Sequence, residues 1–142
     1  MKKVLIVNAN YYKDISNNLI TAAQKKLKSK NIKIYIMNVP GILEIPIVIK
    51  KYIKTFNGFL ALGCVIKGET PHFDLISKVT FKAIMNLSIE HGKPIGNGII
   101  TSLNISQARK RSMITKNILK PNKGFEAANA VVSILKNEPK KK

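Results

Sequence analysis

The chain has 142 residues, enough for one domain with a buried core, and a net charge of +18 at pH 7. It has no apolar run of about 18 residues, which excludes a typical membrane-spanning helix. Its one cysteine, Cys64, excludes an intramolecular disulfide and fits a reducing cytoplasm. The N-terminal apolar segment, residues 4–7, is too short for a signal peptide, so we expect a cytoplasmic protein. His72 and His91 have no cysteine nearby, so no metal site is expected.

Short apolar segments alternate with amphipathic ones along the whole chain. The predicted strands span residues 3–7, 32–37, 59–66 and 95–101. The predicted helices span about residues 14–30, 42–54, 71–91, 105–113 and 122–136. This alternation is typical of an α/β three-layer sandwich, in which a four-stranded parallel sheet has helices on both faces. We expect a single domain over residues 1–142, with 137–142 as a basic, flexible tail.

Capping residues mark the predicted helix ends. Thr70 is expected to cap the third helix, with Pro71 at its first position, where the missing N–H costs nothing. Gly92 is expected to end that helix. The other predicted caps are Asp14 or Ser16 for the first helix, Asn104 with Gln107 in a capping box for the fourth, and Asn122 for the last.

In residues 61–77, ALGCVIKGETPHFDLIS, a strand expected to be buried is followed directly by polar and charged residues. Residues 68–70 are interpreted as a glycine-bearing loop that opens a helix. Backbone N–H groups beside the positive end of a helix form a natural anion site. His72 is expected one residue into the helix, beside that anion, where an imidazole can take and give protons near neutral pH.

The other unusual residues also follow predicted strands. The loops at residues 8–12, 39–44, 67–72 and 101–104 each come after one strand. Ligands of parallel sheets bind outside the carboxyl ends of the strands, so we expect these four loops to form one site. The chain has only seven acidic residues, and four lie in or beside the glycine motifs: Glu44, Glu69, Asp74 and Glu126.

Four segments together resemble the 6,7-dimethyl-8-ribityllumazine synthase family of riboflavin biosynthesis. They are VPGILEIP at 39–46, ALGCVIKGETPHFD at 61–74, residues 94–101 leading to Gln107 and Ala108, and NKGFEAA at 122–128. The resemblance implies a flavodoxin-like fold. It also implies condensation of 5-amino-6-(D-ribitylamino)uracil with 3,4-dihydroxy-2-butanone 4-phosphate, through an imine, elimination of phosphate and ring closure. That reaction has no redox step, so no cofactor is expected.

The resemblance also implies roles for individual residues. His72 is the expected catalytic acid and base. The pyrimidine and ribityl chain are expected to contact Tyr11, Gly41, Ile42, Leu43, Glu44, Cys64, Val65, Ile66, Asn97 and Lys123. The phosphate is expected to contact Gly68, Glu69, Thr70 and Arg111. Tyr12 is the alternative to Tyr11 as the stacking ring, Arg109 is a near neighbour of Arg111, and Glu126 can orient Lys123. At Asn97 many family members have phenylalanine, which closes the pocket from the neighbouring subunit.

A ring of five subunits with sites between neighbours is a further implication of the resemblance. One chain would contribute Tyr11, Glu44 and His72, and the next would contribute Asn97, Arg111 and Lys123. Because the first predicted strand starts almost at Met1, we expect a free pentamer, or two pentamers paired as a decamer, rather than a sixty-subunit shell. Riboflavin synthase is a candidate partner.

The sequence also allows two alternative functions. The charge of +18 motivates a nucleic-acid-binding α/β protein, but lysines are spread along the chain and only Arg109 and Arg111 are arginines. Asn97 and Tyr11 motivate a relative that binds flavin or lumazine without turnover. The sequence does not separate that protein from the enzyme.

Overall fold

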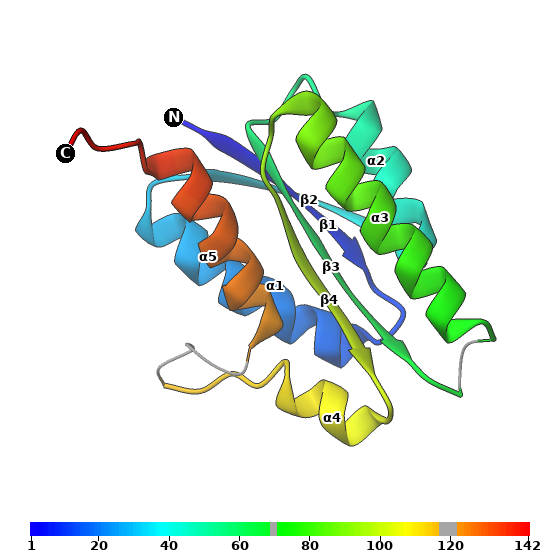
Figure 1. The fold of residues 1–142 in the computed structure, drawn as a ribbon. Coiled ribbons are helices and arrows are strands. Elements are labelled where there is room, and N and C mark those ends of the chain that lie inside the picture. Colours follow the sequence, from blue (N-terminus) through cyan, green and yellow to red (C-terminus); the bar gives the residue numbers. More distant parts are fainter. Residues whose placement is uncertain (69–70, 117–121) are drawn as a thin grey trace.

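The centre of the computed structural model is a four-stranded parallel sheet in the order β2-β1-β3-β4 (Figure 1). The structure describes residues 1–68, 71–116 and 122–142. The strands are β1 (Lys3–Ala9), β2 (Lys33–Val39), β3 (Gly58–Ile66) and β4 (Ile95–Ser102). The four predicted strands are therefore confirmed. Most strands extend further at their carboxyl ends than predicted. The reason is that strand pairing also includes polar residues, such as Asn8 and Asn38, which an apolar pattern does not mark.

Helices cover both faces of this sheet. One face carries α1 (Lys13–Ser29) and α5 (Lys123–Lys136), and the other carries α2 (Ile45–Lys51) and α3 (Phe73–His91) (Figure 1). A short helix, α4 (Ile105–Lys110), follows β4, and a 3-10 turn, η1 (Ile42–Glu44), precedes α2. The predicted three-layer, flavodoxin-like arrangement is confirmed. Within the described residues, no helix is both long enough and apolar enough to cross a membrane.

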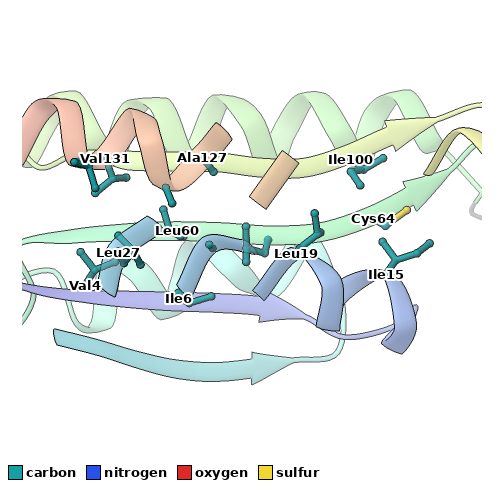
Figure 2. Packing of buried hydrophobic residues seen from close by; sticks show 14 of the residues in the cluster. Val4, Ile6, Ile15, Leu19, Leu27, Leu60, Cys64, Ile100, Ala127 and Val131 are labelled. Carbon is teal, nitrogen blue, oxygen red and sulfur yellow. The ribbon is translucent and has the colours of Figure 1, made fainter. Parts of the chain in front are cut away.

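The core lies on both sides of β3, which is buried along its whole length. Alternate side chains of a strand point to opposite faces, so Leu60 packs toward α1 and α5, whereas Phe59 packs toward α2 and α3. Figure 2 shows the first of these clusters, with Leu19 and Val131 on either side of Leu60. A strand that is covered on both faces needs the continuous apolar run seen in the sequence.

Several predicted helix ends are wrong. The first helix begins at Lys13, so Asp14 and Ser16 lie inside its first turn rather than at its cap. The third helix begins at Phe73, with His72 at the N-cap and Pro71 outside the helix. His72 adopts the left-handed region, with φ 63° and ψ 36°, and this turns the chain just before the helix. Thr70 lies outside the described residues.

Two other helices are shorter than predicted. The segment 42–54 divides into η1 and α2, because Pro46 is tolerated only in the first turn of an α-helix. The fourth helix ends at Lys110 rather than near residue 113.

Three predicted boundaries are confirmed. Gly92 ends α3 with φ 61°. The Asn104 side chain accepts the N–H of Gln107 at 2.9 Å, and the Asn122 side chain accepts the N–H of Phe125 at 3.0 Å.

Glycines bring α5 close to its neighbours. A Cβ atom at Gly124 would collide with the backbone carbonyl of Leu19 in α1, and one at Gly96 in β4 would collide with the carbonyl of Ala127. Because both contacts are backbone contacts, neither partner can rotate away. This close packing holds the first turn of α5 beside the carboxyl half of β4.

Candidate functional site

The first cavity lies beyond the carboxyl ends of β1 and β3, and we call it the β1–β3 cavity. Its volume is about 300 Å³. It is lined by Ala9, Tyr11, Tyr12, Pro40, Gly41, Ile42, Leu43, Glu44, Cys64, Val65, Pro71 and Ile76. Seven of the predicted substrate-binding residues are among them: Tyr11, Gly41, Ile42, Leu43, Glu44, Cys64 and Val65.

The two tyrosines of this cavity differ in exposure. Tyr11 is 74% exposed, whereas Tyr12 is half-buried against the core cluster of α1 and α5. Their rings meet edge to face, with centroids 4.9 Å apart. Tyr12 therefore supports Tyr11, and Tyr11 has the ring face that a ligand can reach. This arrangement favours Tyr11 over Tyr12 as the stacking residue.

The loop after β2 places a carboxylate at the rim of the same cavity. Gly41 has an extended backbone, so its conformation does not require glycine. A Cβ atom there would lie only 3.2 Å from Glu44 Oε1. Glycine at position 41 thus leaves room for the Glu44 carboxylate to fold over the loop. Among the described residues that line this cavity, Glu44 is the one Asp, Glu, Lys, Arg or His.

The second cavity lies along the open edge of β4, between α3 and α5, and we call it the β4–α5 cavity. Its volume is about 420 Å³. It is lined by Phe81, Asn97, Ile99, Ile100, Thr101, Arg111, Lys123 and Glu126. The predicted residues Asn97, Arg111 and Lys123 come together here. Two cations face one carboxylate, so this cavity is suited to an anionic ligand.

Backbone contacts hold Arg111 in position. Its Nη1 donates to the carbonyl oxygen of Thr101 at 2.8 Å, and its own carbonyl oxygen accepts the N–H of Lys123 at 2.7 Å. The guanidinium is therefore tied to the end of β4, and a guanidinium has further N–H groups with which to hold a phosphate. Arg109 and Arg111 are both exposed, but of the two only Arg111 lines a cavity.

No described residue lines both cavities. They are nevertheless close in the sheet, because Val65 of the first pairs with Thr101 of the second. Tyr11 and Glu44 lie in the first cavity, and Asn97, Arg111 and Lys123 lie in the second, whereas His72 lines neither.

Three further predicted residues that the structure describes line neither cavity. His72 is exposed at the start of α3, directly after Pro71, which lines the β1–β3 cavity. Gly68 is exposed with φ 86°. Ile66 is 2% exposed and belongs to the core cluster of α1 and α5. Glu69 and Thr70 lie outside the described residues, so their predicted phosphate contacts stay predictions.

The sequence did not single out Phe81 as a lining residue. Phe81 is in the middle of an amphipathic helix, where an aromatic residue is usually part of the core. Only the packing of α3 against the edge of β4 brings it into the same cavity as Asn97. Thr101 also lines this cavity, and it belongs to the loop at residues 101–104 that was expected at the site. Across residues 1–68, 71–116 and 122–142, no group of three or more His, Cys, Asp or Glu side chains could hold a metal ion.

The chain forms an open parallel α/β sheet, with a mostly apolar cavity and a cationic cavity at the carboxyl half of its strands. These features are typical of a flavodoxin-like protein that binds small molecules. The comparison with known families is more specific. The chain belongs to the 6,7-dimethyl-8-ribityllumazine synthase family, whose model matches residues 1–138.

Individual relatives agree with this family. The chain is 37% identical over 140 residues to the 6,7-dimethyl-8-ribityllumazine synthase of Methylorubrum populi, with 94% of this chain and 80% of the relative covered. It is 37% identical over 141 residues to that of Afipia carboxidovorans, covering 94% and 84%. It is 38% identical over 144 residues to 6,7-dimethyl-8-ribityllumazine synthase 1 of Rhodopseudomonas palustris, again covering 94% and 84%. The resemblance predicted from the four motifs is confirmed, and neither alternative function is favoured.

Proposed function

We propose that the chain condenses 5-amino-6-(D-ribitylamino)uracil with 3,4-dihydroxy-2-butanone 4-phosphate to give 6,7-dimethyl-8-ribityllumazine, the penultimate step of riboflavin biosynthesis. The observation that carries this proposal is the family match over residues 1–138. The two cavities at the carboxyl half of the strands support it, because they hold ten of the residues predicted to bind the substrates. We expect the enzyme to act in the cytoplasm without a cofactor.

The reaction needs proton transfers and one leaving group. The 5-amino group attacks the ketone carbon, and loss of water gives an imine. A proton leaves C3 as the C–O bond to phosphate at C4 breaks, and inorganic phosphate departs. The enol that remains at C3 tautomerises to a ketone. The ribityl-bearing nitrogen then attacks this new carbonyl carbon, and loss of another water closes the ring. No electron acceptor is consumed, so side chains that bind, orient and carry protons are sufficient.

The β1–β3 cavity suits the pyrimidine and its ribityl chain. The exposed ring of Tyr11 can stack on the flat heterocycle, and Glu44 can accept hydrogen bonds from ribityl hydroxyls. Apolar side chains such as Ile42 and Val65 exclude water from the ring. His72, next to Pro71 at the rim, is our candidate for moving protons to and from the reacting nitrogen and carbon atoms.

The β4–α5 cavity suits the phosphate-bearing substrate. Arg111 is anchored through one nitrogen, so it can hold the phosphate with its remaining N–H groups. Lys123 adds a second positive charge, and Glu126 lies in the same cavity to orient it. As inorganic phosphate leaves, these two cations stabilise the developing negative charge.

We propose that a complete site forms between neighbouring copies in a ring of five. The division of the predicted residues between two cavities supports this assembly. A third groove, of about 440 Å³, lies between α2 and α3 and has mostly apolar lining. Around it, Leu43, Ile47 and Val79 are each at least half exposed. Exposed apolar surfaces of this kind mark protein interfaces. The ring is free or paired as a decamer, and riboflavin synthase, which uses the product, is a candidate partner.

The direct test is to incubate the purified protein with both substrates and follow the absorbance of the lumazine. We expect product and inorganic phosphate in equal amounts, and no acceleration over a protein-free control when either substrate is omitted. Binding of the pyrimidine or of lumazine without any acceleration would instead identify a binding protein. Light scattering at moderate salt should give a mass near five or ten subunits, and a monomer would contradict the shared site.

A further inference from the structure

Asn97 is the uncharged amide in the cationic β4–α5 cavity, and the structure shows how its side chain is oriented. Its Oδ1 accepts a hydrogen bond from the backbone N–H of Ile99, two residues further along the strand, at 3.0 Å. β4 pairs only with β3, so it has one open edge. A side-chain oxygen that satisfies such an N–H group is a common local arrangement for asparagine. Because an N–H donor needs an acceptor, the carbonyl end of the amide must face the backbone.

The nitrogen end of the amide, Nδ2, is therefore the end that can bind a ligand. Nδ2 has two N–H donors, and it makes no hydrogen bond to another residue within the part of the chain that the structure describes. Asn97 is half-buried and lines the cavity together with Arg111 and Lys123, which are also donors. Among the described lining residues, only Glu126 contributes a carboxylate. A ligand group that meets this wall must be rich in acceptor oxygens.

We propose that Asn97 is a specificity residue: its Oδ1 stays on Ile99, and its Nδ2 donates a hydrogen bond to a ring carbonyl oxygen of a pyrimidinedione that extends from the β1–β3 cavity of the neighbouring chain to this wall. This inference rests on the proposed function. Two charged groups, Arg111 and Lys123, match the phosphate, whereas a neutral amide donor matches a neutral carbonyl. Phe81 lines the same cavity and can contact the flat ring. A site that hydrogen-bonds a particular substrate group discriminates strongly against ligands that lack it.

A purely structural role for Asn97 predicts different behaviour, and one substitution separates the two. In Asn97→Asp the carboxylate still accepts the N–H of Ile99, but at neutral pH it has no proton to donate and it repels a carbonyl oxygen. In Asn97→Ala both the acceptor and the donor are lost. If the side chain only satisfies the open edge of β4, Asp preserves its role and Ala does not.

A matched control is available in the same chain. Asn104 also uses Oδ1 to accept a backbone N–H, that of Gln107 at 2.9 Å, but it lines neither cavity. Asn104→Asp makes the same chemical change and adds the same charge without placing it in the site. Any general effect of an added carboxylate therefore appears in both Asp variants.

The experiment compares the wild type, Asn97→Asp, Asn97→Ala and Asn104→Asp. We would measure the melting temperature, the calorimetric affinity for the pyrimidine substrate alone, and KM for each substrate. For Asn97→Asp we expect an unchanged melting temperature and pyrimidine binding that is weaker by about tenfold, the scale of a lost hydrogen bond plus repulsion. KM for the phosphate substrate should change much less. Asn97→Ala should lose both pyrimidine affinity and thermal stability, and Asn104→Asp should lose neither.

Two results would overturn the role of Asn97. Wild-type pyrimidine affinity in Asn97→Asp would make the residue purely structural, and an equal rise of both KM values would make the effect one of charge alone. Failure of the proposed function looks different, because the wild type itself would then produce no lumazine. A wild type that turns over normally beside an unaffected Asn97→Asp contradicts only the inference about Asn97.

Discussion

The two cavities of this chain are built on opposite physical principles. The β1–β3 cavity is mostly apolar and aromatic, with Glu44 at its rim. It is lined by the ends of β1 and β3 and by the loops that come after β1, β2 and β3. The β4–α5 cavity concentrates Arg111 and Lys123 along the open edge of β4. The first is suited to a flat, hydroxyl-rich molecule and the second to a phosphate. We therefore expect a condensation between two such substrates to need both cavities.

The largest expected effect is the loss of rate when His72, the candidate proton carrier beside the first cavity, is removed. We expect His72→Ala to slow lumazine formation by about 10²-fold, the lower end of the range for a single general acid or base, because binding in both cavities is preserved. His91→Ala is the matched control, since His91 ends α3 far along the chain from the cavities. The measurement is kcat at saturating concentrations of both substrates. An unchanged kcat in His72→Ala would remove this residue from the mechanism.

Mixing two impaired variants should test whether the cavities of different chains combine. In co-assembled His72→Ala and Arg111→Ala chains, random mixing leaves about a quarter of the sites with both wild-type halves, if each site joins the first cavity of one chain to the second cavity of its neighbour. At a phosphate-substrate concentration well below its KM, we therefore expect activity near a quarter of the wild-type value, above that of either variant alone. The control is His72→Ala mixed with a chain that carries both substitutions. No gain in the first mixture would mean that the site lies within one chain.

The charge of the second cavity should affect one substrate selectively. We expect Arg111→Ala to raise KM for the phosphate substrate by about tenfold or more, because a charge-assisted bidentate contact is lost, with little change for the pyrimidine. Arg109→Ala removes a nearby arginine that lines neither cavity, so both KM values should stay near wild type. If Arg111→Ala weakens both substrates equally, its bond to Thr101 is a structural contact rather than part of a phosphate site.

The smallest expected effect concerns the aromatic wall of the first cavity. Tyr11→Leu should weaken pyrimidine binding by about threefold to tenfold, because ring stacking contributes about 0.5–1.5 kcal/mol beyond area burial. Tyr35→Leu, on β2 away from both cavities, serves as the control for loss of an exposed tyrosine. Calorimetry with the pyrimidine alone measures the difference. An effect on the phosphate substrate of the same size would contradict stacking on the heterocycle.

Local patterns in the sequence were enough for much of the fold. Apolar runs marked the four strands. For β3 the physical reason is burial on both faces, whereas most residues of the edge strand β2 are exposed. Asn104, Asn122 and Gly92 marked helix ends correctly, since capping depends on bonds within a few residues. The start of α3 was misjudged, because a proline after a threonine fits a cap equally well whether the helix begins at once or two residues later.

The parallel α/β sandwich and the family could be predicted from the chain alone, because they follow from periodicity and from short motifs. The same motifs named candidate site residues, but how these are grouped in space depends on the tertiary packing. Backbone contacts at Gly96 and Gly124 set α5 against β4 and α1, and this packing places Lys123 with Arg111 rather than with Glu44. The position of Phe81 in the same cavity as Asn97 likewise depends on contacts between segments far apart in the chain. Such long-range packing leaves no periodic signal in the sequence.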